Sequence, residues 1–239
     1  MNPPIPTNES RRLEALRSYQ ILDTAPEPMF DDVALLASSI CGTPIALMSL
    51  VDSQRQWFKA RVGLDTRETP REHAFCAYTI LGVETMVVED ASTDERFAQN
   101  PLVTSPPHIR FYAGAPLIDR DGNALGALCV IDRKPRHLAD LQRKSLETLG
   151  RTVVAHLELK RVSAQLAESL SELTTVRGLL PICAECKKVR DDKGYWQEVE
   201  SYITSLASVR LTHGLCPECK EAKMLEFKKE RDLSNTPLI

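Results

Sequence analysis

The stretch RFYAGAPLIDRDGNALGALCVID, residues 110–132, decides the fold of this chain. Two arms rich in β-forming residues flank Asp121-Gly122-Asn123. Residues of this kind favour a tight turn, because Gly and Asn accept a positive φ angle at little cost. The stretch therefore predicts a β-hairpin made of two antiparallel strands.

Further strands precede the hairpin. PIALMSLVD (44–52) is a short apolar run bounded by Pro and Asp, which is typical of a buried strand, and QRQWFKARVG (54–63) follows as its pairing strand. TMVVEDAS (85–92) predicts another strand. Because strands and helices are mixed rather than strictly alternating, the expected class is an α+β sandwich with an antiparallel sheet.

A helix is predicted over about residues 31–40, before the first of these strands. Its apolar residues fall on one stripe, and Gly42 marks its end. The stripe consists of Phe30, Val33, Leu36 and Ile40.

His73 and Cys76 stand three residues apart within REHAFCAYTIL (71–81), which has a helical period. On a helix the two side chains share one face. A neighbouring imidazolium can lower the pKa of a thiol and make it reactive or ligand-binding. The alternative is that Cys76, like Cys41 and Cys129, is an inert core residue.

Residues from about 138 to 180 have a helical pattern without proline. Apolar residues recur in it at a 3-4 spacing, with Ser169 as the one polar interruption. Such a stripe predicts a parallel two-helix coiled coil, because one helix alone cannot bury it. The alternative, packing on its own domain, is expected for the first half of the helix. The heptad residues are Leu159, Val162, Leu166, Leu173, Val176 and Leu180.

Five segments occur in a fixed order along the first 160 residues. They are ILDTAPEPMFDDVALLA, CGTPIALMSLVDSQRQWFKARVGL, REHAFCAYTIL, VVEDASTDERFAQNPLV and RFYAGAPLIDRDGNALGALCVIDRKPR. Together they resemble a GAF domain of the bacterial signalling type. The resemblance implies a six-stranded antiparallel sheet with helices on its faces, often a small-molecule pocket, and dimerisation through flanking helices. GAF domains are usually sensory or structural and rarely catalytic.

The signatures that identify the ligand in two GAF subfamilies are missing. The Asn-Lys-Phe-Asp-Glu signature of cyclic-nucleotide-binding GAF domains is not found. Cys76 is followed by Ala77, whereas a His usually follows the chromophore cysteine of bilin-binding GAF domains. The resemblance therefore leaves the ligand as an unknown small molecule.

Polar and aromatic groups within the apolar motifs are the candidates for the lining of such a pocket. The alternative is that most of them are core residues, since aromatic side chains alternating along strands normally pack. The candidates are Trp57, Phe58, His73, Phe75, Cys76, Tyr78, Phe111 and Tyr112.

Two Cys-x-x-Cys pairs stand near the C-terminus, Cys183/Cys186 and Cys216/Cys219, with 29 residues between them. Zn²⁺ prefers four tetrahedral ligands, and two such turns supply four thiolates. Residues 181–225 are too few for a self-sufficient core, and segments of this size often need a metal. The pattern therefore predicts a closed, structural zinc site, and the segment resembles a cysteine-rich module that follows bacterial sensory domains.

Alternatives to four-cysteine zinc stay open. An iron–sulfur cluster also takes four thiolates, and a metal-free dithiol switch fits the same spacing. His213, three residues before Cys216, could be a ligand, a hydrogen-bond partner of a ligand cysteine or a turn cap. Between the pairs, a single amphipathic helix is predicted from Tyr195, Trp196, Val199, Tyr202, Ile203 and Leu206.

Composition narrows the class of protein. The net charge is −3, the pI about 6.0 and the aromatic fraction 5%, which argue against nucleic-acid binding, and the C-terminal lysines are interspersed with acidic residues. No signal-peptide core or membrane-length apolar run occurs, so the prediction is a cytoplasmic protein that no membrane holds. In the cytoplasm a structural disulfide is not expected, and seven cysteines, an odd number, cannot all be paired in disulfides.

The predicted organisation has four parts: a GAF sensory domain with an N-terminal helix (1–158), a stalk helix (159–180), a metal-binding module (181–225) and a polar tail (226–239). The expected function is a homodimeric sensor or adaptor that transmits a small-molecule or redox signal to a partner, such as a separate kinase or response regulator. The protein is predicted not to be an enzyme, because no kinase, cyclase or hydrolase motif is found. The alternatives are a thiol-based, methionine sulfoxide reductase-like enzyme and an iron–sulfur redox or gas sensor.

Overall fold

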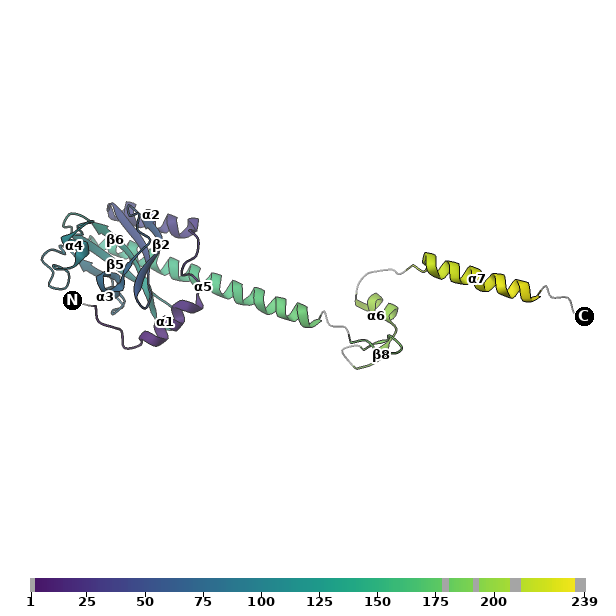
Figure 1. Ribbon diagram of the computed structural model, residues 1–239. Coiled ribbons are helices and arrows are strands. Elements are labelled where there is room, and N and C mark those ends of the chain that lie inside the picture. The colour runs from purple at the N-terminus through teal and green to yellow at the C-terminus, as the bar shows by residue number, and fades with distance from the viewer. Residues whose placement is uncertain (1–2, 178–180, 191–193, 207–211, 235–239) are drawn as a thin grey trace, which may run out of the picture. The chain divides into compact units, whose positions relative to one another are not determined.

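The computed structural model describes residues 3–177, 181–190, 194–206 and 212–234 (Figure 1). The chain divides into two compact units, Met1–Ser169 and Leu170–Ile239. The first contains a sheet with helices on both faces, and the second contains a two-stranded ribbon and helices. The predicted domain boundaries at residues 158 and 225 each fall within a helix and not between two elements. These two boundaries stay predictions.

A six-stranded antiparallel sheet forms the centre of the first unit, which confirms the predicted α+β class. Its central strands are almost completely buried, because both faces of the sheet are covered. The order across the sheet is β3 (Glu68–Pro70), β2 (Arg55–Val62), β1 (Ile45–Val51), β6 (Ala124–Asp132), β5 (Phe111–Ile118) and β4 (Met86–Val88).

The hairpin β5–β6 forms as the sequence predicts, with a loop over residues 119–123. Gly122 has a φ angle of 81°, in the region that favours glycine. The Asp119 carboxylate accepts the backbone N–H groups of Asp121 at 3.0 Å and of Asn123 at 2.7 Å. The loop therefore satisfies its own backbone donors and fixes the register, in which Gly114 lies opposite Cys129.

The helices divide between the two faces of the sheet. α1 (Glu9–Ser18), α2 (Pro28–Cys41) and the start of α5 (Asp140–Arg177) cover one face and form the helix-side cluster, which includes Phe30, Leu128 and Val153. The other face carries η1 (Arg71–His73), α3 (Cys76–Thr79) and α4 (Pro101–Thr104), which cover the second cluster around Phe97. Each face thus has its own apolar core.

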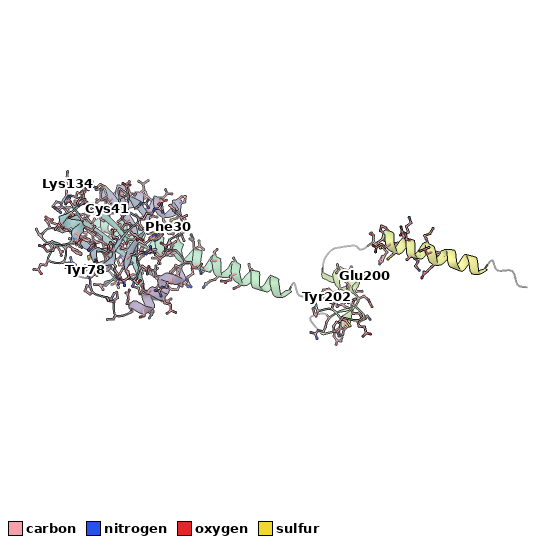
Figure 2. All side chains as sticks on the ribbon, in the orientation of Figure 1. Phe30, Cys41, Tyr78, Lys134, Glu200 and Tyr202 are labelled. Atoms are coloured by element: carbon pink, nitrogen blue, oxygen red, sulfur yellow. The ribbon has the colours of Figure 1, made fainter. Side chains whose placement is uncertain are left out.

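α2 packs on the sheet with a different stripe from the one expected. Its buried residues are Phe30, Val33, Ala34, Ala37 and Cys41, of which Phe30 and Cys41 are labelled in Figure 2. Two alanines on this face let the helix lie close to the strands. Leu36 is 50% exposed and Ile40 is 41% exposed, so these two residues lie outside the buried face.

The second unit contains a short ribbon of β7 (Val189–Arg190) and β8 (Trp196–Gln197), then α6 (Val199–Leu206) and α7 (Pro217–Ser234). Tyr195 and Trp196 precede α6, so the single helix expected to include them begins later. Within the parts of residues 170–234 whose burial is described, Val189 is the one buried side chain.

Several predictions concern residues that lie beyond these ranges. Leu180 lies outside the described residues, as do the side chains of Leu173, Val176 and Leu206. Among the residues that are described, no helix is both long and apolar enough to cross a membrane.

Candidate functional site

A cavity of about 120 Å³ lies on the face of the sheet that α3 covers. Strands β1, β2, β5 and β6 form its floor, and the segments around α3 and residues 102–109 close it. The lining is largely apolar, and includes Leu47, Phe58, Phe75, Ile109 and Ile131. Small-molecule sites commonly have this composition, with a few polar groups that orient the ligand.

Two polar atoms at this cavity have no hydrogen-bond partner among the described residues. They are Oε1 of Gln56 on β2 and Oγ1 of Thr69 on β3. Gln56 is only 5% exposed. Because an unpaired buried acceptor costs free energy, such atoms usually bind water or a ligand donor. The cavity can therefore accept a small apolar molecule that carries an N–H or O–H group.

A cluster of thiol and hydroxyl groups forms one wall of the cavity. Cys76 begins α3 and Cys129 lies in the middle of β6, and their Sγ atoms are 3.7 Å apart. The hydroxyl of Tyr112 donates to Cys76 Sγ at 3.2 Å and lies 2.7 Å from Oγ1 of Thr79. All four residues are buried.

The cluster makes its two thiols unequal. Burial alone would raise the pKa of Cys76, but hydrogen bonds, chiefly from Cys129, outweigh it and lower this pKa. The hydrogen bond to Cys76, together with burial, raises the pKa of Cys129. Burial and the nearby thiols also raise the pKa of Tyr112. Cys76 is therefore the thiol that this environment favours in the ionised form.

Gly114 creates the space that the tyrosine needs. A Cβ atom at this position would lie 2.2 Å from the hydroxyl oxygen of Tyr112. The Tyr112 side chain therefore passes over Gly114 on its way to Cys76, which a larger residue would prevent.

The structure divides the eight predicted pocket residues into groups. Phe58, Phe75, Cys76 and Tyr112 line the cavity. Tyr78 is half-buried beside it, with its ring 4.9 Å from that of Phe97 in an edge-on contact. Trp57 and Phe111 belong to the helix-side cluster, and His73 lies outside the lining, 3.6 Å from the Glu72 carboxylate.

Strand alternation explains part of this division. Trp57 and Phe58 are neighbours on β2, and Phe111 and Tyr112 are neighbours on β5, so one member of each pair must point to each face. The sequence pattern alone makes both members of each pair pocket candidates.

The expected pairing of His73 with Cys76 does not form. Ala74 is extended, with φ −78° and ψ 120°, so η1 ends before α3 begins and the two residues share no helix face. Cys129 takes the place expected for His73 beside the thiol. The hairpin register around Gly122 was the signal that could have placed Cys129 on the same face as Tyr112.

The C-terminal cysteines lie in two separate turns. The backbone N–H of Cys183 donates to Lys188 O, and that of Lys187 donates to Cys183 O, with Lys187 at φ 62°. Cys216 precedes α7, and its Sγ accepts the N–H of Cys219 at 3.4 Å. Backbone hydrogen bonds, from Cys186 above all, lower the pKa of Cys183, and those from Cys219 lower that of Cys216.

A metal centre stays a prediction. In the part of the chain that the structure describes, no group of three or more His, Cys, Asp or Glu side chains is placed to hold an ion. His213, the additional candidate, has its Nε2 atom 3.5 Å from the carboxylate of Glu200. Each of the two turns has the form of a two-thiolate half-site, and the four thiols together have the chemistry that zinc prefers.

A curated relative of this chain is a Pseudomonas aeruginosa protein named as a cyclic di-GMP phosphodiesterase. The two are 46% identical over 160 residues, which are 66% of this chain and 27% of the relative. The prediction that the protein is not an enzyme is wrong, because the GAF part of this chain is closely similar to part of a protein with an enzyme's name.

Solved structures with a similar fold include the GAF domain of an Acinetobacter phosphoenolpyruvate-protein phosphotransferase. It is 18% identical, with a TM-score of 0.47, and the match covers 65% of this chain and 98% of that one. Another is the blue-light absorbing form of the PixJ GAF domain of Thermosynechococcus elongatus. It is 16% identical, with a TM-score of 0.49, and the match covers 71% and 98% of the two chains.

A family model extends the likeness beyond single relatives. The model of the GAF domain matches residues 25–160, which include all six strands of the sheet and the whole lining of the cavity. The match covers more than half of the chain. The chain therefore belongs to the GAF domain family.

Proposed function

We propose that this protein is a sensor whose GAF domain binds a small molecule in the thiol-lined cavity and thereby sets the rate of cyclic di-GMP hydrolysis. The observation that carries the proposal is the 46% identity with part of a protein named as a cyclic di-GMP phosphodiesterase. Because this chain spans 27% of that relative, the hydrolytic activity can belong to this protein or to a protein that it contacts.

The size of the cavity supports a ligand other than cyclic di-GMP itself. An engineered cavity of about 150 Å³ holds one benzene molecule, so a cavity of about 120 Å³ suits roughly five or six non-hydrogen atoms. A cyclic dinucleotide is many times larger. The unpaired acceptor Gln56 Oε1 favours a ligand with a hydrogen-bond donor, and the unpaired hydroxyl of Thr69 can donate to the ligand or accept from it.

A chain of contacts leads from the cavity to α5. Phe58 lines the cavity, while its neighbour Lys59 is buried on the opposite face of β2. Lys59 Nζ contacts Glu27 Oε1 at 2.7 Å, and the other oxygen of Glu27 pairs with Lys160 of α5. Burial raises the pKa of Glu27, but hydrogen bonds from Lys160 and Lys59 outweigh it and lower this pKa. A shift of β2 would therefore move Lys59 and Glu27 and change the ion pair between Glu27 and Lys160 of α5.

An exposed apolar stripe supports dimerisation through α5. Leu159 is 64% exposed, Val162 46% and Leu166 60%, although each occupies a heptad position. A second copy of the same helix would cover this stripe in a parallel coiled coil. In such a dimer, movement of α5 changes the geometry between the two chains.

The C-terminal unit is the proposed output module. Four thiolates, from Cys183, Cys186, Cys216 and Cys219, would hold zinc, with an iron–sulfur cluster as the alternative. The closed turn at Lys187 and the hydrogen bond to Cys216 Sγ support two preformed half-sites. A metal so held would supply structural order, and the exposed Trp196 of β8 offers a contact for a signalling partner.

The test measures cyclic di-GMP hydrolysis. The full chain is assayed alone and then added to the Pseudomonas aeruginosa relative, with the Phe58→Trp variant, which fills the cavity, in parallel. Either hydrolysis by the chain or a severalfold change in the relative's rate is expected, and Phe58→Trp should alter it. The control is Ile5→Trp at a residue that is 72% exposed, which should match the unmodified chain. Neither hydrolysis nor a changed rate would overturn the proposal.

A further inference from the structure

We propose that Cys76 and Cys129 are a peroxide-sensitive dithiol, which closes to a reversible disulfide inside the GAF cavity. The two residues are 53 positions apart in sequence, yet their Sγ atoms are 3.7 Å apart. A disulfide needs a sulfur–sulfur distance of about 2.05 Å, so the atoms must approach by about 1.7 Å. Rotation of the side chains and a small shift of the four-residue helix α3 can supply this movement.

The cavity gives an oxidant access to both sulfur atoms. Cys76 and Cys129 line it together, although they are 1% and 0% exposed on the outer surface. Hydrogen peroxide is little larger than the water molecules that such a cavity can hold. Cys41 is also buried, but it lies in the helix-side cluster on the opposite face of the sheet. Oxidation through the cavity should therefore distinguish Cys76 from Cys41.

The hydroxyl groups around Cys76 suit it to be the attacking sulfur. Thr79 can donate to Tyr112, and Tyr112 donates to Cys76 Sγ. When Cys76 is ionised, the S–H of Cys129 can also point at it. Hydrogen bonds to a thiolate favour the form that reacts with peroxides. Cys129, with its proton retained, is then the resolving thiol.

The reaction balances in two steps with hydrogen peroxide as oxidant. The Cys76 thiolate attacks one oxygen of hydrogen peroxide, so an S–O bond forms as the O–O bond breaks, and hydroxide leaves and takes up the proton that Cys76 released, which makes water. Cys129 then attacks the sulfenic sulfur, so the S–S bond forms as the S–O bond breaks, and water leaves with the Cys129 proton. Two thiols lose two electrons, and hydrogen peroxide becomes two water molecules. A dithiol reductant reverses the change by exchange.

Closure of the disulfide would change the cavity. Cys76 follows Phe75, whose ring stacks on Phe97 with centroids 4.0 Å apart. Drawing α3 toward β6 moves this ring pair and narrows the space between them and the sheet. The dithiol would thus switch the cavity between an open and a contracted form. This consequence rests on the proposed function, whereas formation of the disulfide does not.

The test maps the thiols of the full-length chain after treatment with hydrogen peroxide. Tryptic peptides 72–96 and 121–133 contain Cys76 and Cys129, so mass spectrometry can detect them as a linked pair. The expected result is a linked pair that forms at stoichiometric peroxide and disappears with dithiothreitol. Cys129→Ser should leave a sulfenic acid at Cys76, which dimedone traps. The matched control, Cys41→Ser, should form the pair as the unmodified chain does.

Gly114→Ala tests the role of the tyrosine without altering either thiol. The added methyl group displaces the Tyr112 hydroxyl, so the linked pair should form at least tenfold more slowly. Failure to find the pair in the folded, unmodified chain with excess peroxide would overturn the proposal, as would oxidation of Cys76 no faster than Cys41. Neither result depends on cyclic di-GMP hydrolysis, so the two proposals can fail separately.

Discussion

The two units of this chain obtain their order in different ways. The GAF unit buries apolar side chains on both faces of its sheet, in two clusters that include Phe30 and Phe97. In the described parts of the C-terminal unit, Val189 is buried, whereas Trp196 is 50% exposed and Phe227 is 64% exposed. Burial of apolar area drives folding in the first unit. The described part of the second unit buries little apolar area, so we expect its order to depend on a metal, a partner or both.

Metal removal should give the largest difference between the units. Structural zinc contributes about 10 kcal/mol or more to folding of small domains. We expect one zinc ion per chain by elemental analysis. After chelation, amide protection should be lost in β7, β8, α6 and α7, and the GAF unit should be unchanged.

Two single substitutions sharpen this prediction. Cys183→Ser should abolish stoichiometric metal, whereas Cys41→Ser, in the GAF core, should retain it. If iron and visible absorbance are found instead, the same four thiolates hold an iron–sulfur cluster and not zinc. A metal-free C-terminal unit that stays protected from exchange contradicts the comparison.

Truncation of a core aromatic should affect the GAF unit alone. Phe30 is fully buried, and its ring contacts His156 edge-on at 5.2 Å. Phe30→Ala should lower the free energy of unfolding of this unit by about 3–5 kcal/mol, measured by denaturant titration, and leave the metal content unchanged. The matched change in the C-terminal unit, Phe227→Ala, should cost less than about 0.5 kcal/mol. Equal effects would mean that both units rely on apolar cores.

An ion-pair cluster makes the GAF unit sensitive to acid. Glu9 accepts hydrogen bonds from Arg12 at 2.8 and 2.9 Å and from Arg71 at 2.5 Å, and the Arg12 side chain is fully buried. Burial alone would raise the pKa of Glu9, but these hydrogen bonds outweigh it and lower the pKa from 4.5 to about 2. Ionised Glu9 therefore adds about 3 kcal/mol to the free energy of unfolding of the GAF unit. This contribution is complete above pH 4.5 and is lost as the pH falls toward 2.

Glu9→Gln measures this contribution. The variant should unfold more easily than the unmodified chain at pH 7, and the difference in unfolding free energy should shrink toward zero near pH 2. Glu14→Gln, at an exposed position on the same helix, is the control, and its unfolding free energy should match that of the unmodified chain. A difference in unfolding free energy between Glu9→Gln and the unmodified chain that does not change with pH would contradict this prediction.

Disruption of the exposed stripe on α5 should have the smallest effect on folding. Leu166→Glu places a charge in the proposed coiled-coil seam and should weaken self-association at least tenfold, or about 1.4 kcal/mol, by analytical ultracentrifugation. Gln165→Glu adds the same charge one position away and should associate normally. Because the GAF unit has its own core, its unfolding should be unchanged. If the unmodified chain is monomeric in the same measurement, the proposed dimer is refuted.

The sequence predicts the elements of the sheet better than the contacts on it. The buried run at 45–51 and the hairpin around Gly122 carry strong local signals, and both form. Choosing the cavity side of a strand requires its register, and the sequence alone did not separate Phe58 from Trp57. The proximity of Cys129 to Cys76 depends on a long-range contact between β6 and α3, which no local pattern encodes.

The helices show the same limit. The apolar spacing of α2 locates the helix, but Leu36 and Ile40 lie outside its buried face because Ala34 and Ala37 face the sheet instead. A small residue contributes little to an apolar stripe and much to close packing. In the C-terminal unit, Trp196 joins β8 rather than a helix, because pairing with Arg190 decides its conformation.

The position of β6 has a consequence for how the GAF unit opens. All nine of its residues are buried, and it is hydrogen-bonded to β1 on one side and to β5 on the other. Fraying from either edge of the sheet must release other strands before it reaches this one. The amide hydrogens of Leu125 to Val130 should therefore exchange with solvent last of all, at the rate of complete unfolding.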